Sequence, residues 1–298
     1  MLDSLDIWPP GPGQPLVSQQ PDAELISILK QIDTNRMRAT VEKLVSFGTR
    51  HTLSNQTDPV RGIGAARDWI AAEMRTYAAA SNGRMVVTVP SYVQQVSSRI
   101  PNATVISNIV ATLTGSKEPN RVYVISGHYD SRVTDILNFE ADSPGADDDA
   151  SGVAISMELA RVMATHQPAA TIMFAAVAGE EQGLFGSNFM ATTLKQNGVD
   201  VQGMLDNDIV GSSKADDGTI DQFDIRMFVS GLPASNTANQ NLQLASIGGE
   251  NDSPAHQLAR FVAEVAQNAV TQMNGKHIFH PIFDGKRNVN EPPQKNFD

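Results

Sequence analysis

Residues 122–131 read VYVISGHYDS, an apolar, β-branched run that passes directly into a histidine and an aspartate. A run of this kind, without alternating polar residues, is typical of a strand buried on both faces of a sheet. A second such run, TIMFAAV at residues 171–177, passes into AGEE. Helical patterning follows at residues 152–164 and 185–195. Strands that alternate with helices predict an α/β domain with a mostly parallel sheet.

The same alternation extends in both directions from this stretch. Upstream, the patterning predicts helices at 23–33, 35–47 and 60–79 and strands at 85–89 and 108–113. Downstream, it predicts strands at 204–210, 224–229 and 277–283, polar loops at 212–222 and 231–251, and a last helix from about 252 to 274. We assign residues 1–34 to an N-terminal arm and first helix, and residues 35–298 to a single domain.

Candidate ligands follow the carboxyl ends of three of these strands. His128 and Asp130 follow the first strand, Glu180 and Glu181 follow the second, and residues 206–208, which read DND, belong to the third. In open α/β sheets, ligand sites lie beyond the carboxyl ends of the strands. We therefore expect these side chains to meet at one edge of the sheet.

An acidic run, residues 147–149, precedes the helix that begins near Ser151. Acids in this position commonly cap a helix N-terminus, and the run taken alone is explained equally well as a cap. The convergence of several such groups favours a metal, because an apolar sheet would not gather them at one edge without a cation. The groups that offer nitrogen and oxygen ligands suited to zinc are His128, Asp148, Glu181 and Asp208.

Two further acids have roles in such a site. Asp130, two residues after His128, is placed to hold the second imidazole nitrogen and so to set the tautomer. Glu180, next to the candidate ligand Glu181, is free to accept a proton from water acidified by zinc. We therefore interpret Asp130 and Glu180 as catalytic residues and zinc as the cofactor.

The composition excludes several other functions. The formal net charge is −11, from 33 acidic and 22 basic residues, which argues against nucleic acids and anionic membranes as partners. The chain has no cysteine, which excludes disulfides, thiolate zinc ligands and cysteine nucleophiles. Neither a signal peptide nor an apolar run long enough to span a membrane is visible in the sequence.

Four motifs occur in order: GHYDS at 127–131, PGADDDASG at 144–152, GEEQGLFGS at 179–187 and NDIVG at 207–211. Together with the segment SFGTRH at 46–51, they resemble the signatures of metallopeptidase family 28, the dizinc aminopeptidases of the bacterial leucyl aminopeptidase type. The resemblance covers roughly residues 38–275. It implies a zinc-exopeptidase fold, a three-layer sandwich in which helices flank a mixed, mostly parallel central sheet.

The resemblance also implies roles for the candidate residues. His128 would bind one zinc, Asp148 would bridge two, and Glu181 and Asp208 would complete the two ligand sets. Glu180 would be the general base of a reaction that removes an N-terminal, usually apolar, residue from peptide substrates. The family further suggests a secreted or periplasmic protein, and it leaves the oligomeric state open.

The chain departs from the family in one respect. The family's fifth ligand, a histidine in a C-terminal loop, has no counterpart after Phe283, where the sequence reads DGKRNVNEPPQKNFD. We therefore expect the C-terminus to be truncated or altered and the site to hold two zinc ions or fewer. His277 and His280 are the remaining candidates for the fifth ligand.

Two other functions remain open. A non-catalytic member of the fold, retained for binding, is favoured by the missing fifth ligand and opposed by the intact Glu180 and Glu181. Glutaminyl cyclases share the fold with a single zinc and transfer an acyl group within a peptide, but the acidic run at 147–149 favours hydrolysis. A preference for amino-terminal over carboxy-terminal residues cannot be read from the sequence.

Overall fold

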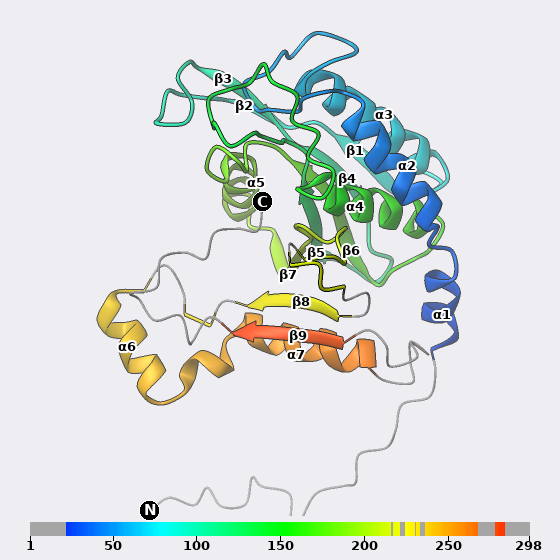
Figure 1. The fold of residues 1–298 in the computed structure, drawn as a ribbon. Coiled ribbons are helices and arrows are strands. Elements are labelled where there is room, and N and C mark those ends of the chain that lie inside the picture. The colour runs from blue at the N-terminus through cyan, green and yellow to red at the C-terminus, as the bar shows by residue number, and fades with distance from the viewer. Residues whose placement is uncertain are drawn as a thin grey trace, which may run out of the picture.

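A computed structural model of the 298-residue chain describes residues 22–215, 217–220, 224–229, 231–232, 236–267 and 278–283 (Figure 1). Its central sheet has five strands in the order β1-β4-β6-β5-β7. Their bounds, in the same order, are Met85–Thr88, Ile109–Leu113, Ala170–Val177, Glu118–His128 and Asp200–Asp206. β5 pairs in parallel with β6 and β7, whereas β4 pairs antiparallel with β6 and β1. Four of the five strands therefore share one direction, and β4 opposes them.

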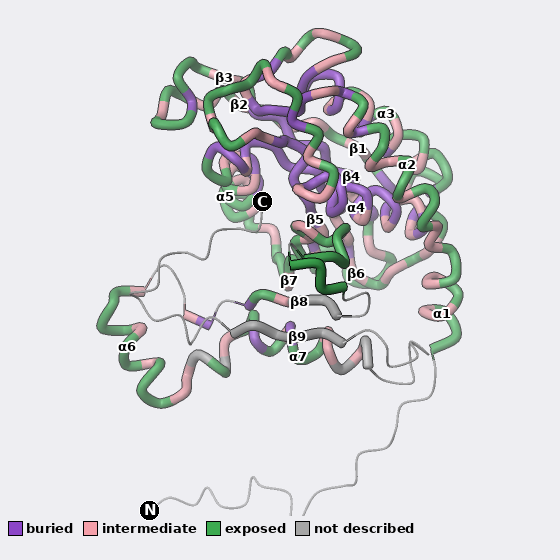
Figure 2. The backbone as a smooth tube through the Cα atoms, in the orientation of Figure 1, coloured by how far each residue is buried: buried purple, intermediate pink, exposed green. Residues whose placement is uncertain are grey.

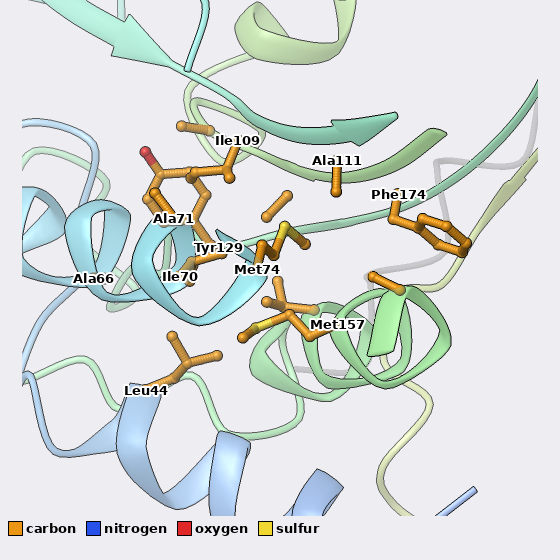
Figure 3. Close-up of a cluster of buried hydrophobic side chains, with 14 of the residues drawn as sticks. Leu44, Ala66, Ile70, Ala71, Met74, Ile109, Ala111, Tyr129, Met157 and Phe174 are labelled. Atoms are coloured by element: carbon orange, nitrogen blue, oxygen red, sulfur yellow. The ribbon is translucent and has the colours of Figure 1, made fainter. Parts of the chain in front are cut away.

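One face of this sheet is covered by the helices α3 (Ile63–Ala79) and α4 (Ala150–Met163), and α2 (Thr34–Val45) packs on α4. Because successive strand residues point to opposite faces, every second residue of β4 and β6 meets these helices. Ala111 from β4 and Phe174 from β6 lie in one buried cluster with Met74 and Met157 of the helices (Figure 3). This cluster is the main core of the domain.

The other face packs against α5, Phe185–Gln196. Met190 of this helix is buried against Val110, Val124 and Val177, which alternate with the residues of the main core along their strands. The buried residues thus line both faces of the sheet, between the two helical layers (Figure 2). This arrangement confirms the three-layer α/β fold with a mixed, mostly parallel sheet.

Two smaller sheets flank the central one. β2 (Ser91–Gln94) and β3 (Thr104–Ser107) pair antiparallel, while β8 (Asp224–Val229) and β9 (Ile278–Phe283) pair in parallel. The remaining helices are α1 (Ala23–Leu29), α6 (Ala238–Ser246), the 3-10 turn η2 (Gly249–Asp252) and α7 (Pro254–Gln267). In Figure 1, α7 packs along β8 and β9, on the β7 side of the central sheet. None of the described helices is both long and apolar enough to cross a membrane.

Two of the predicted elements were wrong in position or kind, and one pair of strands was not predicted at all. The third strand was expected at 204–210, but β7 covers Asp200–Asp206, and Ile209, with φ of 51°, cannot continue it. The polar segment 231–251 was expected to be a loop, yet it contains α6, which starts with a capping box between Thr237 and Gln240. The β2–β3 pair was not expected, because its four-residue strands carry little apolar periodicity.

Candidate metal centre

The candidate ligands lie where three parallel strands end. His128 is the last residue of β5, Val177 ends β6 four residues before Glu181, and Asp206 ends β7 two residues before Asp208. Because β5 pairs in parallel with both neighbours, these three ends share one edge of the sheet. The fold therefore places the groups as expected from the strand patterns.

His128 is buried and directs its two ring nitrogens to different partners. Nε2 lies 3.0 Å from the carboxylate of Asp148 and 3.7 Å from that of Asp208. Nδ1 lies 3.1 Å from the backbone carbonyl oxygen of Asp130 and 3.6 Å from its carboxylate. An Nδ1–H that donates to the Asp130 carbonyl leaves Nε2 free to bind a metal, so Asp130 orients the imidazole through its backbone more closely than through its side chain.

Asp130 links this histidine to the loop after β6. Its fully buried carboxylate accepts hydrogen bonds from the Thr52 hydroxyl at 2.9 Å and from the N–H groups of Glu180 and Glu181 at 3.3 and 3.2 Å. Burial opposes its ionisation, but His128 and these donors outweigh burial and hold the pKa of Asp130 below its ordinary value. Asp130 therefore fixes the position of the Glu180–Glu181 segment relative to His128.

Asp149 also comes close enough to be a ligand. One atom each from His128, Asp149 and Asp208 lie within 4.8 Å of one another. However, the two carboxylate oxygens of Asp149 accept from the N–H of His128 and the N–H of Gly152, both at 2.9 Å. Asp149 is thus the N-cap of α4, whereas the Asp148 side chain is 37% exposed and faces His128 Nε2. The structure therefore favours Asp148 over Asp149 as the ligand.

The Asp208 loop is held by the segment before α4. Gly211 N–H donates to the Asp147 carboxylate at 2.7 Å, and Val210 N–H donates to the Ser151 hydroxyl at 3.1 Å. Asp206, the other acid of this segment, accepts from the Ser126 hydroxyl. Of the two acids in residues 206–208, Asp208 is therefore the one whose carboxylate lies near His128 Nε2.

Glycine at position 152 allows this close approach. A methyl group there would collide with the Asn207 carbonyl oxygen and would lie 2.7 Å from both Asp149 carboxylate oxygens. We expect Gly152→Ala to lower the free energy of unfolding by about 1–3 kcal/mol, because the backbone must shift to relieve the overlap. Thermal unfolding measures this. Gly203→Ala is the control, since its methyl group would meet only side chains, the nearest atom lying 3.1 Å away on Leu258. Equal losses in the two variants would contradict the assigned contact.

Negative charge is crowded in this site. Burial raises the pKa of Glu180 to about 6, of Glu181 to about 7 and of Asp149 to about 8, and neighbouring carboxylates add to each shift. Burial opposes a charge on His128, but Asp130, Asp148 and Asp208 outweigh it and raise its pKa. A cation bound by the same atoms would replace that proton and relieve the repulsion. The donor set, one imidazole and several carboxylates, fits zinc.

Glu181 differs from the other candidate ligands. Its carboxylate pairs with Arg132 at 2.6 Å, and its backbone carbonyl accepts from Arg99 at 3.1 Å. The structure thus brings the carboxylates of Asp148 and Asp208 to His128, whereas the carboxylate of Glu181 forms an ion pair with Arg132. Ligation by Glu181 remains a prediction.

The position of the fifth ligand also remains a prediction. His277 and the segment after Phe283 lie outside the described residues, and His280 falls in β9. Whether the C-terminus is altered is therefore not tested by the described part of the chain.

Comparison with known proteins identifies the family. The model of peptidase family M28 matches residues 108–272, a range that contains His128, Asp130, Asp148, Glu180, Glu181 and Asp208 but neither His277 nor His280. The chain belongs to peptidase family M28. A "probable zinc metalloprotease" of Pyricularia oryzae is 61% identical over 270 residues, covering 89% of this chain and 54% of that protein. The chain spans between 54% and 60% of the length of the curated relatives it matches.

Solved structures share the M28 fold. The LapA aminopeptidase of Legionella pneumophila matches with a TM-score of 0.57 at 15% identity, over 92% of this chain and 62% of that one. The glutaminyl cyclase of Tannerella forsythia matches with a TM-score of 0.56 at 21% identity, over 85% of this chain and 79% of that one. Identities this low show the fold alone, so they do not separate hydrolysis from acyl transfer.

Two residues of this M28 site were not expected from the sequence. Arg132 directly follows the GHYDS motif, and Arg50 lies in the SFGTRH segment, so both stand in or next to motifs whose chemistry was assigned to other residues. Their roles depend on partners more than 45 positions away, Glu181 for Arg132 and Tyr129, Pro144 and Gly145 for Arg50. Sequence patterns carry no signal for such pairs.

Proposed function

We propose that this chain is the metal-binding domain of a zinc-dependent exopeptidase that hydrolyses the N-terminal residue of peptides. The observation that carries the proposal is the convergence of Asp148 and Asp208 on His128 Nε2, with Glu180 at the end of the adjacent parallel strand. His128, Asp148, Glu181 and Asp208 would hold one or two zinc ions. Bound zinc would supply a Lewis acid that polarises the scissile carbonyl and lowers the pKa of water.

Glu180 would move the proton. Its side chain is not paired with any arginine in the described part of the chain, in contrast to Glu181, and its backbone N–H donates to Asp130. Glu180 would accept a proton from the attacking water and deliver it to the nitrogen of the leaving amine. A carboxylate with a pKa raised by burial suits this role, because a base works best when its pKa lies near the operating pH.

The pH dependence should follow this base. Burial raises the pKa of Glu180 to about 6, and a bound cation would lower it again. The deprotonated form is the active one, so kcat/KM is expected to fall as the pH drops through about 6 or below, and to level off above it. A pH–rate profile of the zinc-loaded protein measures this. A profile that is flat from pH 4 to 8 would exclude Glu180 as the base.

Two observations support cleavage at the N-terminus rather than the C-terminus of the peptide. The negative charge of the site favours a free α-ammonium group, and the chain shares its fold with an aminopeptidase. The test compares leucine 4-nitroanilide with its N-acetylated form and with a C-terminally free blocked dipeptide. Hydrolysis of the first compound alone is expected. Preference for the blocked dipeptide would indicate a carboxypeptidase. Cyclisation of an N-terminal glutaminyl peptide without hydrolysis would indicate a glutaminyl cyclase.

A further inference from the structure

Arg50 is fully buried close to the metal centre, and its guanidinium donates only to backbone carbonyl groups among its assigned contacts. Nε donates to Tyr129 at 2.7 Å, and Nη1 donates to Leu44 at 3.2 Å and to Pro144 at 2.6 Å. Nη2 donates to Gly145 at 2.8 Å. A buried guanidinium is costly unless its donors are satisfied, so these contacts offset the cost of burying the charge.

Three of the four accepting carbonyls, those of Tyr129, Pro144 and Gly145, belong to the two loops that carry ligands, and the fourth, that of Leu44, lies in α2. Tyr129 stands between His128 and Asp130, and Gly145 precedes Asp148 by three residues. The Gly145 carbonyl also accepts from the N–H of Ala150, the first residue of α4. The guanidinium therefore spans the space between the histidine loop after β5 and the acidic loop before α4.

The backbone of Arg50 reinforces the same link. Its N–H donates to the Ser131 hydroxyl at 3.1 Å, and its carbonyl accepts from the Ser131 N–H at 3.3 Å. The Ser131 hydroxyl in turn donates to the Ser143 carbonyl at 2.8 Å. Burial lowers the pKa of Arg50 to about 10, while Asp130, Asp149 and Asp148 act in the opposite direction through their charge. Arg50 is thus close enough to these carboxylates to interact with them electrostatically.

We infer that Arg50 is a positioning residue of the metal centre, one that sets the separation between His128 and Asp148 by joining their two loops. This inference rests on the proposed zinc site. Its geometric basis is the planar fork of arginine, which presents donors in fixed directions to several acceptors, whereas lysine offers one flexible ammonium group. Residues that orient metal ligands without touching the metal commonly change metal affinity by about 10- to 100-fold when mutated.

The chain offers a matched control in Arg84. Its guanidinium also donates to two backbone carbonyls, those of His166 at 2.6 Å and Ala164 at 3.1 Å. These carbonyls lie just after α4, at the opposite end of that helix from Asp148. Arg84→Lys therefore removes a smaller guanidinium fork, bonded beyond the far end of α4, without touching either ligand loop.

The experiment measures zinc affinity by competition with a chromogenic chelator, on the full chain and on its Arg50→Lys and Arg84→Lys variants. The thermal stability of each metal-free protein is recorded in parallel. We expect Arg50→Lys to bind zinc about 10- to 100-fold more weakly than the unmodified chain, and Arg84→Lys to bind it with unchanged affinity. Equal zinc affinities for the two variants would overturn the inference, whatever their stabilities.

If Arg50→Lys does not fold, a milder pair of variants tests whether Arg50 positions the ligand loops. Ser131→Ala removes the hydroxyl that ties Arg50 to Ser143, and Ser81→Ala removes a buried hydroxyl that joins Ala78 to Met85 away from the site. Ser131→Ala is expected to weaken zinc binding, and a loss no greater than that of Ser81→Ala would overturn the inference. An unmodified chain that binds no zinc would instead refute the proposed function, and the role of Arg50 with it.

Discussion

Replacing Glu180 with glutamine is expected to lower kcat by about 100- to 10,000-fold, the range typical for the loss of a general base. Glutamine has nearly the same shape but cannot accept a proton at the pH of the reaction. Zinc should stay bound, because the cluster of His128, Asp148 and Asp208 does not depend on this side chain. The measurement is the hydrolysis rate at saturating substrate, with zinc content determined on the same preparation.

Glu118→Gln is the control for this experiment. Glu118 stands at the opposite end of β5, where it is half-exposed and pairs with Arg121 at 2.7 Å. Surface pairs of this kind contribute little, so kcat should not change. If Glu180→Gln had the same kcat as Glu118→Gln, Glu180 would not be the general base. If Glu180→Gln lost its zinc, Glu180 would instead be a metal ligand.

Replacing Asp148 with alanine is expected to abolish zinc binding at both metal positions if its carboxylate bridges them. The affinity should fall by more than about 100-fold, since even residues that only orient a ligand account for 10- to 100-fold. The Asp148 side chain is 37% exposed, so its removal leaves little cavity and the domain should remain folded. Zinc content after exhaustive dialysis, together with a thermal unfolding curve, measures both effects.

Asp142→Ala is the matched variant, because Asp142 is exposed and pairs with Arg61 at 2.6 Å on the surface. It should retain the full zinc content. If Asp148→Ala retained as much zinc as Asp142→Ala, Asp148 would not be a ligand, and Asp149 would become the candidate from the same acidic run.

The strands that could be predicted from the sequence are those whose apolar side chains face both layers. β5 and β6 have continuous β-branched and apolar runs because both faces are covered, and their residues just beyond the last apolar position are the ones that reach the site. His128 was located in this way. The acidic run 147–149, taken alone, was explained equally well as a helix cap, and in the structure Asp149 of this run is the N-cap of α4.

The elements that could not be predicted depend on contacts between distant residues. β7 is a strand at the edge of the central sheet, with exposed residues such as Val201 and Met204. Its first residues are largely polar, so the sequence pattern does not predict where the strand begins. The pairing of Arg132 with Glu181 and the burial of Arg50 arise only when loops that are far apart in the sequence meet in the fold. A local pattern cannot report such contacts, which explains why these arginines were absent from the predicted site.

The two alternative functions make distinct predictions at this site. A non-catalytic domain would bind peptide or zinc without turnover, and Glu180→Gln would then change nothing measurable. A cyclase would act only on N-terminal glutamine and would not release an amino acid. We propose the exopeptidase because Asp148 lies 3.0 Å from His128 Nε2 and because, among the described residues, Glu180 has no arginine partner, whereas Glu181 pairs with Arg132.

The most direct test of the zinc site is the zinc stoichiometry of the purified 298-residue chain, determined in the same sample as the hydrolysis of a leucyl chromogenic amide. We expect one or two zinc ions per folded chain and a hydrolysis rate that disappears with a chelator and returns with added zinc. A folded chain that binds no zinc, or that hydrolyses the amide equally well in excess chelator, would contradict this expectation.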